Sequence, residues 1–119
     1  MGTVRPVRQL EAFQVVLLRR PVDAPTLDDE TLDRLQNEHL AFLDDLRADG
    51  RAVTTGPFLD QDDQRMRGMV IYRVASVEQA RELATTDPLV IAGRLEVEAM
   101  TFLCPPGTLL PAGQPVSVG

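Results

Sequence analysis

The chain has 119 residues, 44% of them hydrophobic and 25% charged, which is the composition of an average globular protein with a single domain. Its 18 acidic and 12 basic residues give a formal net charge of −6, which argues against nucleic acid or an anionic membrane as its main partner. No stretch has the roughly 18 apolar residues of a membrane helix, and the lone Cys104 cannot form an intramolecular disulfide. We therefore expect a reduced, cytoplasmic protein.

All 12 basic residues are arginine, so Schiff-base chemistry on a lysine is excluded. The arginines are scattered along the chain, as Arg34, Arg47, Arg65 and Arg81 illustrate. We attribute the use of arginine in place of lysine to the coding bias of a GC-rich genome. The sequence predicts no basic binding surface.

The first predicted element is a strand over residues 13–18, after a flexible arm at residues 1–12 that has no periodicity. Its run FQVVLL is apolar on both faces, which favours a strand buried on both sides. A long helix is predicted next. Thr26 and Asp29 resemble a capping box at its start, and Gly50 is a suitable residue just past its end.

His39 lies at the centre of the apolar face of this predicted helix. At 100° per residue, the helix places five apolar side chains within about 60° of it. They are Leu32, Leu35, Phe42, Leu43 and Leu46.

The remaining elements follow from turn and capping residues. Ser76 and Gln79 form a second capping box, and Asp87 before Pro88 caps a short helical turn. The predicted elements are strands at 51–57 and 67–74, a helix starting after Ser76, a helical turn at 87–93, a strand at 95–103 and a Pro/Gly-rich tail at 104–119.

The order β-α-β-β-α-β predicts an α+β, ferredoxin-like domain over residues 13–103, with both helices on one face of the sheet. The other face would then carry Val16, Leu18, Met100 and Phe102, and it needs a cover. A second copy of the chain would supply it, so we expect a homodimer or a larger assembly of such dimers.

His39 is the first candidate for acid–base chemistry, because a free imidazole titrates near neutral pH, at about 6.5. The alternative is a packed histidine bonded to a backbone carbonyl. Asp87 lies in a loop that the fold brings near the helix, and its carboxylate could hold one imidazole nitrogen. Asp87 also has a purely structural interpretation as a helix cap, and the two roles are compatible.

Thr55, Gly56 and Pro57 end a predicted strand and could line a pocket for a substrate. We expect no metal and no cofactor. The chain has one His and one Cys, no CxxC or HxxxH pair and no glycine-rich phosphate loop. The run Asp60 to Asp63 fails as a calcium loop, because Arg65 and Ile71 stand where such a loop needs Gly and Glu.

Five segments together resemble the YCII-related (YciI-like) family over about residues 13–103. These segments are the apolar first strand, NEHLAFLDDLRADG, TTGPF, SVEQARELATTDP and AGRLEVEAM. The resemblance implies a dimeric α+β barrel of two ferredoxin-like subunits and a pocket with a His–Asp pair, here His39 and Asp87. One similar enzyme eliminates HCl from a chlorinated hydroxyquinol, so the resemblance also implies proton transfer on a small ring compound.

Two functions remain open from the sequence. In the first, His39 is the general base or acid of a cofactor-free elimination, isomerisation or hydrolysis of a small molecule, and Asp87 orients it. In the second, the same pocket binds a small molecule without reaction, and His39 supplies a hydrogen bond.

Overall fold

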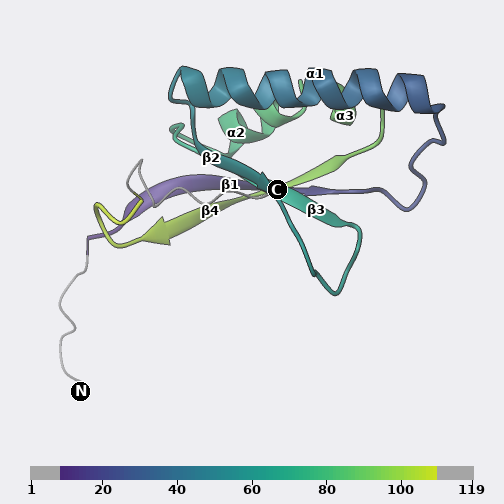
Figure 1. The fold of residues 1–119 in the computed structure, drawn as a ribbon. Helices are drawn as coiled ribbons and strands as arrows, with labels where there is room; N and C mark the ends of the chain where they lie inside the picture. The colour runs from purple at the N-terminus through teal and green to yellow at the C-terminus, as the bar shows by residue number, and fades with distance from the viewer. Residues whose placement is uncertain (1–8, 110–119) are drawn as a thin grey trace.

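In the computed structural model, which describes residues 9–109, the chain forms one antiparallel sheet covered by helices on one face. The strands are β1 (Glu11–Arg19), β2 (Ala52–Pro57), β3 (Met66–Tyr72) and β4 (Glu96–Cys104). Their order across the sheet is β2-β3-β1-β4. The helices are α1 (Asp29–Ala48), α2 (Val77–Ala84) and α3 (Pro88–Ile91), all on the same side (Figure 1). This is the predicted ferredoxin-like fold.

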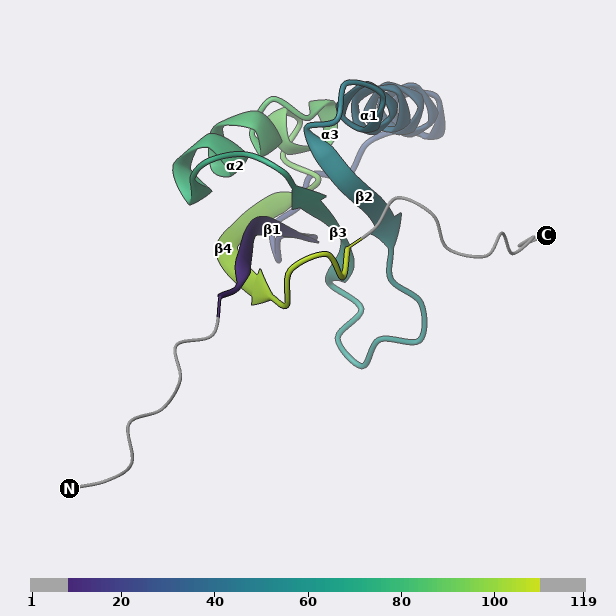
Figure 2. The same cartoon turned by 90° about the vertical axis from the view of Figure 1, so that its left-hand side faces the viewer.

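The two longer helices divide the sheet between them. Seen end-on, α1 lies over the β2 side, α2 lies over the β4 side, and the short α3 lies between them (Figure 2). The main core fills the space under these helices, with Val16, Val70 and Tyr72 of the sheet against Leu46 of α1 and Ala80 of α2. This arrangement brings the start of α3 close to the middle of α1.

The prediction for the uncovered face of the sheet is right for Met100 and Phe102 of β4 and wrong for the residues of β1. Val16 and Leu18 point toward the helices, while Phe13, Val15 and Ile71 form a second cluster on the open side. Met100 is the β4 partner of Val15, so it shares the open face with Val15. Because β1 is apolar on both faces, the alternation of its side chains could not show which face the helices cover.

Helix α1 begins at a different residue from the one expected. Asp28, and not Thr26, is its N-cap, and the Asp28 carboxylate accepts a 2.8 Å hydrogen bond from the Thr31 amide. This bonding lowers the pKa of the Asp28 carboxyl. A carboxylate also suits the positive end of the helix dipole better than a hydroxyl does. The other end is as predicted, with Gly50 at a φ of 81° just past the C-cap.

The predicted caps of α2 and α3 are confirmed. The Ser76 hydroxyl accepts from the Gln79 amide, while the Gln79 side chain accepts from Ala75, one residue before the cap. At α3, the Asp87 carboxylate accepts from the Leu89 amide, and Pro88 occupies the first turn.

β1 is longer than the sequence indicated, and β4 has the predicted length but is shifted by one residue. β1 begins at Glu11, inside the predicted arm, and pairs there with Cys104, inside the predicted tail. Residues 1–8 and 110–119, the rest of the predicted arm and tail, lie outside the described residues. No helix within residues 9–109 has the length and apolar character to cross a membrane.

Candidate functional site

His39 and Asp87 meet in the interior, between the middle of α1 and the start of α3. The His39 Nδ1 lies 2.6 Å from the Asp87 Oδ2, and the two residues are 48 positions apart in the chain. Both are buried, with 8% and 1% of their surface exposed. His39 is thus not a packed residue bonded to a backbone carbonyl, because its partner is a carboxylate.

The surroundings of Asp87 determine which nitrogen of His39 carries the proton. The Asp87 Oδ1 accepts the Leu89 amide at 2.9 Å, which leaves Oδ2 for the imidazole. An ionised carboxylate only accepts hydrogen bonds, so Nδ1 of His39 is the donor. In a neutral ring, Nε2 is then the acceptor. Within the described residues, Nε2 has no hydrogen-bond partner. It is also absent from the buried polar atoms that lack a partner, so Nε2 is accessible from outside the protein interior.

His39 lines a cavity of about 340 Å³ between α1 and the β2–β3 end of the sheet. Thr55, Gly56 and Pro57, the residues expected at a pocket, line the same cavity. Leucines supply much of the apolar wall: Leu18 of β1, Leu40 and Leu43 of α1, Leu89 of α3, and Leu95 just before β4. The volume lies at the lower end of the range for small-molecule sites, roughly 300 to 1,000 Å³.

Three arginines line this cavity that were not predicted from the sequence. Arg20, Arg47 and Arg67 line it together with His39. Their positions in the chain are scattered, but the fold brings them together, so our interpretation of the arginines as unclustered was wrong. One signal could have found two of them. Arg20 follows β1 and Arg67 is the second residue of β3, and antiparallel pairing places the end of β1 beside the start of β3.

Tyr72 places a second polar group in the core near this pair. It is fully buried, and its hydroxyl has no hydrogen-bond partner among the described residues. Burial raises the pKa of Tyr72 far above its usual value, and the charge of Asp87 raises it further. The phenol is therefore neutral at physiological pH and does not serve as a base.

The described residues contain no group of three or more His, Cys, Asp and Glu side chains that could hold a metal ion. Cys104 is a buried free thiol at the end of β4. Among residues 9–109, the cavity is lined by His39 and by the carboxylate of Asp44, and Asp44 is already paired with Arg47, so His39 is the side chain left for proton transfer.

Comparison with known proteins agrees with this fold. The model of the YCII-related domain matches residues 13–102. No match was found among the curated proteins. Among solved structures, the chain is similar to a 5-chloro-2-hydroxyhydroquinone dehydrochlorinase from Burkholderia phenoliruptrix in complex with 2,5-dihydroxybenzoquinone. The TM-score is 0.50 and the identity 22%, covering 76% of this chain and 91% of the other, so this likeness concerns the fold. Because the family match spans most of the chain, the protein belongs to the YCII-related domain family.

Proposed function

We propose that the protein is an enzyme that moves a proton on a small, cyclic or aromatic molecule, using His39 as general base or acid and no cofactor. The observation that carries this proposal is the 2.6 Å contact between His39 Nδ1 and Asp87 Oδ2 at the wall of a cavity. A buried pair of this kind leaves Nε2 of the ring for a ligand. It also stabilises the imidazolium that forms when Nε2 takes a proton.

The reaction class follows from what Nε2 can do. It removes a proton from an acidic C–H or O–H group of the bound molecule. In an elimination, the electron pair of the broken C–H bond forms a π bond as the leaving group departs with its own bonding pair. In an isomerisation, the imidazolium returns the proton to another atom of the same molecule. The dehydrochlorinase with a similar fold makes elimination of HCl the first reaction to test.

The test compares the wild-type protein with His39→Gln in D2O. The substrates are 5-chloro-2-hydroxyhydroquinone and a panel of small cyclic ketones and hydroxyquinones, and the readouts are chloride release and deuterium incorporation by NMR. We expect wild-type turnover, reduced by about 10²- to 10⁴-fold in His39→Gln, the usual contribution of a positioned acid or base.

Glu38→Gln is the matched control, since its side chain is exposed on the same helix and, within residues 9–109, pairs with Arg34 alone. It should keep wild-type activity. Full turnover by His39→Gln would contradict the proposed role of the imidazole. A wild-type protein that binds members of the panel unchanged, with no exchange at any pH, would favour the small-molecule-binding function.

We also propose that the protein is a homodimer formed through the open face of the sheet. Phe13, Val15 and Ile71 form an apolar cluster there, and the side chains of Met100 and Phe102 beside it are 37% and 47% exposed. Phe13, Val15 and Ile71 are themselves buried, so Met100 and Phe102 provide the exposed apolar area, and a second copy of the same face would cover it.

Light scattering should give at least twice the 13.1 kDa mass of the chain at micromolar concentration. Phe102→Asp should shift the protein toward monomer, because it places a charge in the apolar contact. Ile91→Asp is the control, with an equally drastic change at a side chain that is 73% exposed on α3, over the other face. A monomeric wild type would refute the dimer.

A further inference from the structure

The cavity beside His39 has a strong excess of positive charge. Three guanidinium groups line it, from Arg20, Arg47 and Arg67, against the single carboxylate of Asp44. The two charges of Arg47 and Asp44 compensate each other, since Arg47 bonds to Asp44 and to the Thr55 hydroxyl at the rim. Arg20 and Arg67 therefore give the cavity its excess positive charge.

Neither Arg20 nor Arg67 has an ion pair among the described residues. Arg67 donates to the backbone carbonyl of Gln64, which is a neutral acceptor. The Arg20 Nε is inaccessible to solvent and has no hydrogen-bond partner. A buried donor without an acceptor is costly, and an ion bound nearby is one of the explanations for such a group.

The neighbours of Arg20 add to the unbalanced charge. Burial lowers the pKa of Arg20, and the positive charges of Arg94 and Arg67 lower it further. Arg94 itself donates to the Pro25 carbonyl, another neutral acceptor. Because a guanidinium keeps its proton in proteins, this end of the cavity holds like charges close together. An anion bound among them would relieve the repulsion.

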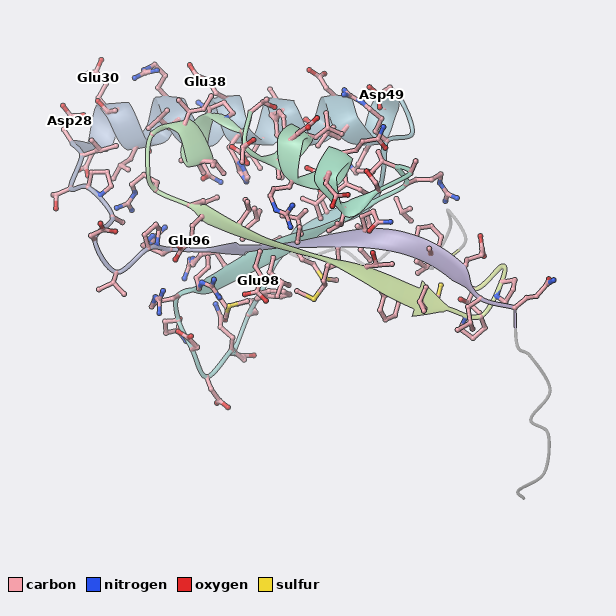
Figure 3. The ribbon with its side chains drawn as sticks, turned by 180° about the vertical axis from the view of Figure 1, so that it is seen from behind. Asp28, Glu30, Glu38, Asp49, Glu96 and Glu98 are labelled. Atoms are coloured by element: carbon pink, nitrogen blue, oxygen red, sulfur yellow. The ribbon has the colours of Figure 1, made fainter. Side chains whose placement is uncertain are left out.

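The acidic residues that give the chain its net charge of −6 do not supply that anion. Glu30 and Glu38 point outward from α1, and Asp28 and Asp49 flank its two ends (Figure 3). On the sheet, Glu96 and Glu98 pair with Arg19 and Arg65. The charge of the cavity is thus positive although the net charge of the protein is negative.

We propose that the molecule acted on at His39 carries a carboxylate-type oxyanion, and that Arg20 and Arg67 bind it. This assignment rests on the proposed function and names the substrate class. The planar guanidinium matches a carboxylate with two parallel hydrogen bonds. The anion and the reacting group belong to one small molecule, because the arginines and His39 line the same cavity of about 340 Å³. Anchoring the charged end orients the other end toward Nε2.

The test measures binding alone, so that it is independent of turnover. Benzoate, 2-hydroxybenzoate and cyclohexanecarboxylate are titrated by NMR against their own carboxamides, which have nearly the same shape and no charge. We expect at least one carboxylate to bind ten-fold or more tightly than its amide. Arg20→Gln and Arg67→Gln should each abolish most of that preference and leave amide binding within about twofold.

Arg34→Gln is the matched control, because it removes the same charge from the outer side of α1, where Arg34 pairs with Glu38. It should keep the preference. If Arg20→Gln fails to fold, the effect of Arg67→Gln, near the start of β3, decides whether the arginines bind the carboxylate. The proposal is overturned if no carboxylate binds better than its amide, or if both arginine variants keep the preference. A protein with Arg-dependent anion binding but no turnover would refute the proposed reaction and leave this site in place.

Discussion

Replacing Asp87 with asparagine is expected to reduce turnover by about 10²- to 10⁴-fold in a chain that still folds. The carboxylate accepts two hydrogen bonds, from the Leu89 amide and from Nδ1 of His39. Asparagine has one acceptor oxygen, which can keep the helix cap, and its NH2 group then faces Nδ1. The imidazole must accept that bond through Nδ1, so its proton moves to Nε2. The nitrogen that should take the substrate proton is then already protonated.

The experiment measures kcat and urea stability for Asp87→Asn, Asp87→Ala and Asp45→Asn. Alanine removes the cap as well, which should add a loss of about 1 kcal/mol in unfolding free energy. Asp45 is an exposed aspartate of α1, so its amide variant controls for the change of charge. An Asp87→Asn protein with near wild-type kcat would show that the tautomer of His39 is irrelevant to the reaction.

Gly68→Ala should be among the most destabilising single substitutions in the sheet, at about 1 to 3 kcal/mol, because it overpacks a backbone contact. A Cβ at Gly68 would lie 2.5 Å from the Gly56 carbonyl oxygen and 3.1 Å from the Pro57 Cα. Both are backbone atoms of the adjacent strand, so no side-chain rotation can make room. The strands β2 and β3 would have to separate, and Gly56 and Pro57 would move at the cavity wall.

Gly56→Ala is the control for this prediction. Gly56 lies on the facing strand, and a Cβ there meets nothing within 4 Å. Its unfolding free energy should stay within about 0.5 kcal/mol of wild type, as for most substitutions without a clash. Urea denaturation of the two variants provides the comparison, and equal losses would mean that glycine flexibility, not close packing, is what β2 and β3 require.

The parts of the fold that the sequence predicted correctly depend on local chemistry. Ser76 and Asp87 cap helices through bonds to amides two or three residues away, and Gly50 ends α1 by adopting a positive φ. These signals lie within one turn of the residue that carries them. The position of His39 on the buried face of α1 is predictable for the same reason, since helical periodicity is a local property.

The features that sequence analysis missed depend on pairing between distant segments. The open face is set by the register of β1 against β4, which pairs Val15 with Met100 over 85 positions. The convergence of Arg20 and Arg67 likewise requires β1 and β3 to be neighbours. Neither the identity of the open face nor the meeting of these two arginines produces a pattern within a short stretch of sequence. The choice of Asp28 over Thr26 is a smaller error of another kind, between two residues that are both good caps.

The two hydrogen bonds that the Asp87 carboxylate accepts have a consequence for the entropy of the proposed reaction. With one oxygen bound by the first turn of α3 and the other by the imidazole, the carboxylate is held in one orientation, and its side chain is 2% exposed. The loss of that freedom occurs once, when the chain folds. In the proposed reaction, each cycle would therefore start with the base already oriented, and aligning it would add nothing to the barrier to proton transfer.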